Sequence, residues 1–104
     1  MQLPGIIGGS KKNALKYANE LEALSKVDGY LAKGYIYEYD KELEKAELYY
    51  KKAVVTGGSV TCYTKLTQFY INQKQTKKAL KYLHEGYSIH KNEVFLKQIK
   101  ILEK

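Results

Sequence analysis

The side chains that could do chemistry in this chain are two histidines, one cysteine and a pair of nearby glutamates. His84 and His90 are six positions apart, so on a helix they point to different faces, and neither has an obvious carboxylate or cysteine companion. Cys62 has no placed base and is expected to be a small, buried or half-buried residue. Glu42 and Glu44 lie in a lysine-rich turn, as solubilising charges do. With no phosphate loop, metal-ligand cluster or nucleophile elbow, the sequence predicts a non-enzyme that holds neither metal nor cofactor.

The composition indicates one small all-α domain. The 104 residues are 44% hydrophobic and 28% charged, and Lys, Leu, Glu, Ala and Tyr dominate. The single proline, Pro4, interrupts none of the later helices. No apolar run approaches the ~20 residues of a membrane span. The start, MQLPGIIGGS, lacks a basic region, so no signal peptide is predicted; a cytoplasmic location is favoured, and an exported parent protein stays open.

The net charge of +7 comes entirely from lysine, since the chain has no arginine. Arginine is the side chain that forms bidentate hydrogen bonds to phosphates and guanines, so its absence disfavours a protein that recognises nucleic acid. The pairs Lys51-Lys52 and Lys77-Lys78 are expected on solvated outer helices, where they are not interleaved with exposed aromatic residues. Weak, salt-sensitive nucleic-acid binding through these lysines remains the third functional hypothesis.

Capping residues and turns divide the chain into six predicted helices. Ser10, Asp28 and Ser59 are the predicted caps of the first, second and fourth helices. The sixth helix follows HKN and has Val94, Phe95, Ile99 and Leu102 as its apolar side. The expected ranges of the first five are about 10–25, 28–39, 42–56, 59–72 and 76–89.

Two of these helix pairs are related by a constant offset in sequence. It equals the number of residues from Tyr30 to Tyr63, and we call it the repeat spacing. Six pairs of residues align at it without a gap: Tyr30 with Tyr63, Gly34 with Thr67, Tyr37 with Tyr70, Ala46 with Ala79, Tyr50 with Leu83, and Ala53 with Gly86. The pattern resembles the tetratricopeptide repeat, a ~34-residue helix-turn-helix with the signature W-x2-L-G-x2-Y…A-x3-F…P. The glycine and alanines let paired helices approach closely, and the large residues fill the gaps. Lys33 and Thr67 depart from the signature, and the closing proline is absent from both units.

The resemblance implies a short right-handed α-solenoid of antiparallel helix pairs. We expect an extended segment at 1–9 and a single tetratricopeptide-like domain at 10–104. Within that domain, 10–27 is a half repeat, 28–58 and 59–90 are repeats, and 91–104 is a terminal capping helix. Because the half repeat lacks its first helix, a fragment of a longer protein is one reading of the chain.

In this family the first helix of each unit lines a concave, peptide-binding groove. By resemblance, the groove residues would be Leu31, Tyr35, Glu38 and Tyr39 from one unit and Thr64, Lys65, Gln68 and Asn72 from the next. The tyrosines either rim a peptide groove or pack against a neighbouring helix or a second copy of the chain, and the sequence leaves both open. Since only Lys65 among the matching positions is basic, binding of chaperone C-terminal tails is disfavoured.

The leading hypothesis is therefore a non-catalytic module that binds a protein or peptide and has no small-molecule substrate. The second is a self-associating assembly element, because the first helix lacks its usual partner and its outer face is expected to be open.

Overall fold

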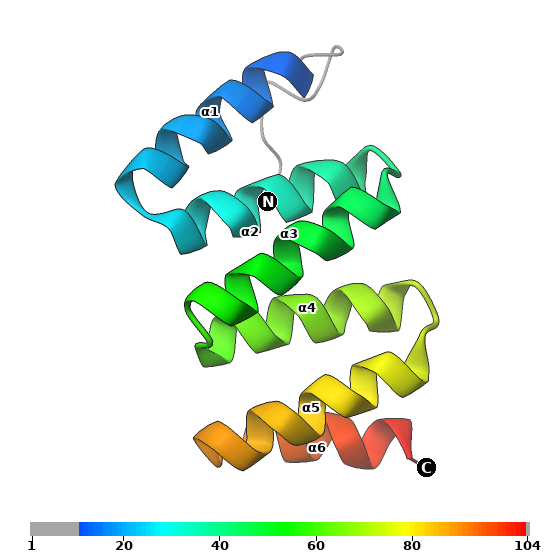
Figure 1. The fold of residues 1–104 in the computed structure, drawn as a ribbon. Coiled ribbons are helices and arrows are strands. Elements are labelled where there is room, and N and C mark those ends of the chain that lie inside the picture. Colours follow the sequence, from blue (N-terminus) through cyan, green and yellow to red (C-terminus); the bar gives the residue numbers. More distant parts are fainter. Residues whose placement is uncertain (1–10, 104) are drawn as a thin grey trace. The chain divides into compact units, whose positions relative to one another are not determined.

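The computed structural model describes residues 11–103 and shows an all-α fold in that range (Figure 1). The chain divides into two compact units, residues 1–56 and 57–104, here called the first and second units. The first unit contains α1 (Lys11–Leu24), α2 (Lys26–Tyr39) and α3 (Leu43–Thr56). The second contains α4 (Val60–Asn72), α5 (Thr76–His90) and α6 (Glu93–Leu102). No described helix is long and apolar enough to cross a bilayer.

The six predicted helices are confirmed, with ends close to those expected. Ser59 caps α4 as expected, because its hydroxyl accepts the Cys62 amide at 3.2 Å. The predicted cap at Asp28 is wrong: Ser25 is extended, accepts the Asp28 amide and starts α2 earlier than expected. Ser10 and the predicted segment 1–9 lie outside the described residues.

The break between the two units falls next to the predicted repeat boundary at 58/59, after Thr56. Whether residues 10–104 form a single domain with the four predicted subdivisions stays a prediction. Each unit is a run of three helices in which neighbours along the chain pack together (Figure 1).

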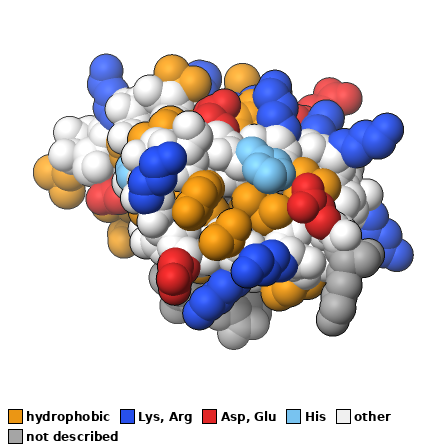
Figure 2. Space-filling view, turned by 90° about the horizontal axis from the view of Figure 1, so that it is seen from below, with side chains coloured by type: hydrophobic (Ala, Val, Ile, Leu, Met, Phe, Trp, Pro, Cys, Tyr) orange, Lys and Arg blue, Asp and Glu red, His pale blue; other side chains and the backbone are white. Residues whose placement is uncertain are grey.

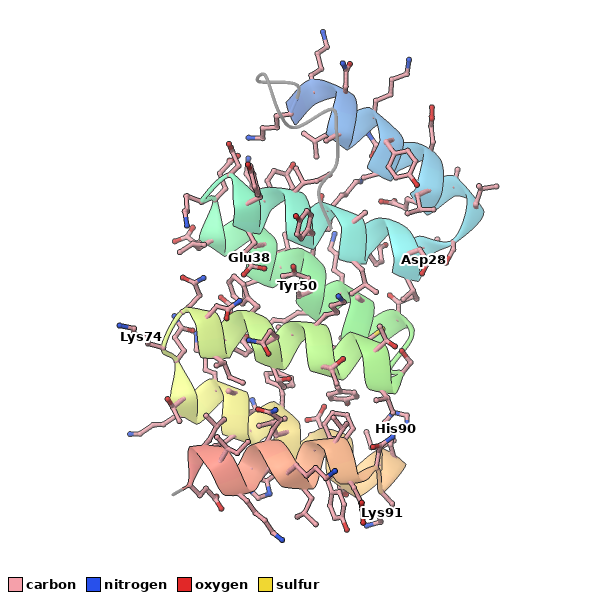
Figure 3. All side chains as sticks on the ribbon, turned by 180° about the vertical axis from the view of Figure 1, so that it is seen from behind. Asp28, Glu38, Tyr50, Lys74, His90 and Lys91 are labelled. Atoms are coloured by element: carbon pink, nitrogen blue, oxygen red, sulfur yellow. The ribbon has the colours of Figure 1, made fainter. Side chains whose placement is uncertain are left out.

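The same turn joins the helices of the α2–α3 hairpin and of the α4–α5 hairpin. After α2, the Lys41 amide donates to the Glu38 carbonyl at 3.1 Å and the Glu42 amide to the Tyr37 carbonyl at 2.9 Å. In the second unit, the residues that align with these at the repeat spacing form the same two amide-to-carbonyl hydrogen bonds, with N···O distances of 3.0 and 2.9 Å. This pair of bonds is the Schellman helix stop, which needs a left-handed residue. Lys41 and Lys74 supply it with φ of 65° and 58° (Lys74 is labelled in Figure 3).

A stacked pair of tyrosines with a lysine over it also recurs at the repeat spacing. In the first unit Tyr37 of α2 stacks on Tyr49 of α3, with ring centroids 5.6 Å apart, and the Lys45 ammonium lies 5.3 Å from the Tyr37 ring. In the second unit Tyr70 stacks on Tyr82 at 5.8 Å, with Lys78 at 5.7 Å from Tyr70. We call each set a Tyr–Tyr–Lys triad. Stacking and cation–π attraction hold the two helices of each hairpin together beside the turn.

The core of each hairpin is built on the residues that align at the repeat spacing. Ten of the twelve are buried; Tyr30 and Tyr37 are half-buried. At Gly34 the approach is close enough that an added Cβ would lie 2.8 Å from atoms of the Tyr50 ring. At Gly86 an added Cβ would lie 2.9 Å from the Phe95 ring, so α6 packs on α5 in the same manner. Small residues under large rings set the helix spacing.

We predict that Gly34→Ala lowers the free energy of unfolding by about 1–3 kcal/mol, because the new methyl group overpacks against the buried Tyr50 ring. The same substitution should cost much less in a Tyr50→Leu background, where the ring is gone. Denaturant unfolding of the two single variants and the double variant measures this coupling. If the losses in free energy of unfolding of the two single variants add up to the loss of the double variant, the ring does not set the spacing between the helices.

The lysines whose backbone has a positive φ give a second prediction. Lys41→Gly should raise the free energy of unfolding by about 0.5–1 kcal/mol, because glycine adopts a positive φ without steric cost. Lys51→Gly is the matched control, since Lys51 is exposed within α3 and should lose about 1 kcal/mol. Thermal melts of the two variants should move in opposite directions; a fall in both would contradict the assigned turn geometry.

Candidate functional site

The four predicted groove residues of the first unit lie on α2. Leu31, Tyr35 and Glu38 are half-buried, and Tyr39 is 51% exposed. The rings of Tyr35 and Tyr39 lie with centroids 6.4 Å apart, so together they form one aromatic surface. Glu38 already accepts a hydrogen bond at 2.9 Å from the hydroxyl of Tyr50 on α3 (Figure 3). Glu38 therefore holds the hairpin together as well as lying on this face.

The four predicted groove residues of the second unit lie on α4, and the structure separates them into two groups. Thr64 and Gln68 line a recess of about 150 Å³ bounded by α4, α5 and α6, and Lys65 and Asn72 do not. Lys65 is exposed, and Asn72 accepts the Gln68 amide at 3.0 Å. The recess has six further lining residues: Thr67, Ile71, Leu83, Val94, Phe95 and Gln98.

The sequence reasoning missed these six recess residues. Its groove residues came only from first helices, so Leu83 of α5 and the contribution of α6 were left out. Phe95 is fully buried and its ring meets the Tyr63 ring edge-on at 6.1 Å, so α6 contacts α4 at this point. The available signal was the change from Tyr50 to Leu83 at aligned positions, because it removes a ring from the core.

The polar side chains that could do chemistry have structural partners. His84 does have a carboxylate companion, contrary to the expectation: its Nε2 lies 3.4 Å from Glu103, which α6 brings back beside α5. His90 (labelled in Figure 3) lies 2.6 Å from the Gly58 carbonyl, and its ring stacks on that of Phe95. Cys62 is buried, as predicted. Residues 11–103 contain no group of three His, Cys, Asp or Glu placed to hold a metal ion.

Two tyrosine hydroxyls are bonded to glutamates, and their pKa values are raised. Burial, followed by the charge and hydrogen bond of Glu38, raises the pKa of Tyr50 above its ordinary value. In the second unit the Tyr63 hydroxyl donates to Glu85 at 2.6 Å. Burial and then this bond raise the pKa of Tyr63 to about 12. Both hydroxyls are therefore neutral donors that join helices, rather than reactive phenolates.

An ion-pair cluster joins the start of α1 to the turn after α2. The Lys11 ammonium contacts Glu42 and lies 2.9 Å from Asp40, and Lys45 lies 3.3 Å from Glu42. Hydrogen bonds from Lys11 and then Lys45 lower the pKa of Glu42 to about 2. Lys11 also lies 5.5 Å from the Tyr37 ring. Glu42, expected to be a solubilising charge, is thus a point where α1 is attached to the first hairpin.

The positive charge is unevenly divided between the units. The first unit has nine lysines and eight acidic residues, a net charge of +1, and the second has nine lysines and three acidic residues, a net charge of +6. Figure 2 shows lysines around exposed hydrophobic side chains, seen from the side of α5 and α6. The lysine pairs adjoin aromatic rings that are not exposed: Lys52 lies 5.1 Å from the half-buried Tyr49 ring, and Lys78 lies over the buried Tyr70 ring.

The raised pKa of Tyr63 predicts how stability depends on pH. Between about pH 10 and 12 the unfolded chain has lost the Tyr63 proton and the folded chain retains it, so stability must fall as the pH rises. Denaturant midpoints measured across this range should fall less steeply for Tyr63→Phe than for the unchanged chain. Equal slopes would show that the Tyr63–Glu85 bond does not persist in solution.

Comparisons with protein-family models, with curated proteins and with solved structures find no match for this chain.

Proposed function

We propose that the chain is a tetratricopeptide-like interaction module that binds a peptide or partner protein through the exposed faces of α2 and α4. The observation that carries the proposal is the recurrence of one hairpin design in both units, with the same turn and the same Tyr–Tyr–Lys triad at the repeat spacing. Repeated hairpins of this kind commonly present the same helix face from each unit to a partner.

The α2 face supports the proposal because it combines aromatic area with a polar edge. Tyr35 and Tyr39 adjoin each other and both keep exposed surface, beside Leu31 and Glu38. Tyrosine supplies a large contact area with little side-chain entropy to lose, which is why it is frequent at binding surfaces. On α4, Thr64 and Gln68 place polar groups beside an apolar recess. A few placed polar groups beside an apolar surface are the usual composition of a ligand-binding site.

Self-association through α1 is less well supported than peptide binding. The expectation was that the outer face of α1 is open and available to a second copy. Its exposed residues are mainly polar: Lys12, Asn13, Lys16, Asn19 and Glu20, with Tyr17, Ala23 and Leu24 as the exceptions. A face of this composition is typical of a solvated capping helix. Exposed apolar residues are also not confined to α1, because Ile89 of α5 and Ile101 of α6 are 59% and 62% exposed.

The proposal predicts that random twelve-residue peptides displayed on phage, selected on the immobilised chain, bind through the α2 face. Synthetic copies of the selected peptides should bind Tyr39→Ala about tenfold more weakly, a loss of about 1.4 kcal/mol. Fluorescence polarisation measures the affinity. Tyr35→Ala should also weaken binding. The melting temperature of Tyr39→Ala should change little, because the ring is half exposed.

Tyr17→Ala is the matched control, since Tyr17 on α1 is 52% exposed and lies outside the proposed surface. It should leave the affinity unchanged. Equal affinity for Tyr39→Ala and the unchanged chain would reject the α2 face, and a selection that enriches no peptide would reject the function. Sedimentation of the free chain, measured alongside, detects self-association as the competing explanation.

A further inference from the structure

The recess of the second unit corresponds to the space that a tyrosine ring fills in the first unit. In the first unit the Tyr50 ring lies on Gly34 and its hydroxyl bonds to Glu38. At the repeat spacing, the residues at these positions in the second unit are Leu83, Thr67 and Ile71. All three of them line the recess. Replacing the tyrosine with leucine therefore removes a phenol ring from the core at the place where the recess is found.

The size and lining of the recess fit one aromatic ring. The recess, of about 150 Å³, has the volume of a cavity that accommodates benzene, and four of its eight lining residues are aliphatic or aromatic. Leu83 and Phe95 are fully buried, Ile71 is half-buried and Val94 is partly exposed, so the floor is apolar. Such a floor stabilises a ring by removing it from water, and Phe95 adds ring–ring contact.

The polar groups of the recess lie where a hydroxyl group on the ring could meet them. The Thr67 hydroxyl donates to the Thr64 carbonyl at 3.1 Å, so its own oxygen can still accept a hydrogen bond. The residues Gln68 and Gln98 also line the recess, and the side-chain amide of Gln98 makes no hydrogen bond to any residue in 11–103. An amide can either donate to or accept from a phenol hydroxyl.

We propose that this recess binds a single phenol ring in the place that Tyr50 occupies in the first unit. Where the ring is the tyrosine side chain of a bound peptide, the proposal rests on the proposed function and names the anchor residue of that peptide. A free phenol tests the recess without any peptide. Hence the recess and the peptide-binding function can succeed or fail independently of each other.

The probe is p-cresol, which has the ring and hydroxyl of a tyrosine side chain, titrated into the ¹⁵N-labelled full chain and followed by amide chemical shifts. We expect saturable shifts that are largest at amides of the lining residues. Toluene, which lacks the hydroxyl, should bind more weakly. Shifts that do not saturate, or that spread evenly over both units, would overturn the proposal.

The decisive variant copies the first unit into the second by combining Thr67→Gly, Ile71→Glu and Leu83→Tyr. Its own tyrosine should occupy the recess, so the saturable shifts should disappear. Ser88→Tyr is the matched control, because Ser88 is exposed on α5 and lies outside the recess. It adds the same ring to the same helix and should leave p-cresol binding unchanged.

A second variant keeps the test valid if the triple variant does not fold. Gln68 is exposed, so Gln68→Phe should fold and cover the mouth of the recess, weakening p-cresol binding at least tenfold. Unchanged p-cresol binding in a folded triple variant or in Gln68→Phe would place the ring elsewhere and reject the site. A chain that binds selected peptides but not p-cresol would reject the recess alone.

Discussion

The close approach of two helices within each hairpin is the constraint on which the rest of the structure depends. Gly34 lies directly beneath the Tyr50 ring, and Ala46, Ala53 and Ala79 are fully buried at the equivalent crossings. At such short spacing a ring on one helix reaches across to the polar groups of the other, as Tyr50 reaches Glu38. The Tyr–Tyr–Lys triad depends on the same spacing, because its stacked rings come from both helices, whereas the Schellman turn is a local feature of the helix end.

The two units show two ways of completing this design. In the first, a large ring covers a glycine and the core is filled by the chain itself. In the second, Leu83 stands over Thr67, and the volume that the ring would take becomes a recess bordered by α6. Identical turns therefore support different interiors. The turn and triad fix the hairpin, and the remaining core positions are free to specialise. The second unit also carries nearly all of the net charge, so the two differ in surface as well as in core.

Much of the fold follows from the sequence, and less of the candidate site does. Helix ends were predictable because Ser59 and the Gly57-Gly58 pair act locally, and the repeat was visible in the spacing of tyrosines and alanines. The cap at Ser25 was missed because Asp28 is an equally good capping residue by type, and only the backbone geometry separates the two. The change from Tyr50 to Leu83 indicated where a ring is missing from the core, but the walls of the recess could not be predicted because they depend on how α6 packs on α5 through Phe95 and Gly86. The Tyr–Tyr–Lys triads could have been predicted from the sequence, because Tyr49 and Tyr82 also align at the repeat spacing.

The side-chain bonds that join helices within each unit reach over no more than about one repeat. Lys11 and Glu42 are 31 residues apart, and His90 and Gly58 are 32 apart, which is about one repeat in each case. Closing a loop of about one repeat costs more entropy than forming a helical turn, and the cost rises only slowly with loop length. Proteins dominated by local contacts have a low contact order and fold in microseconds to milliseconds. In this chain most contacts are the local ones of helical turns and hairpins, and the bonds between helices reach over no more than about one repeat, so each unit holds itself together without a distant part of the chain.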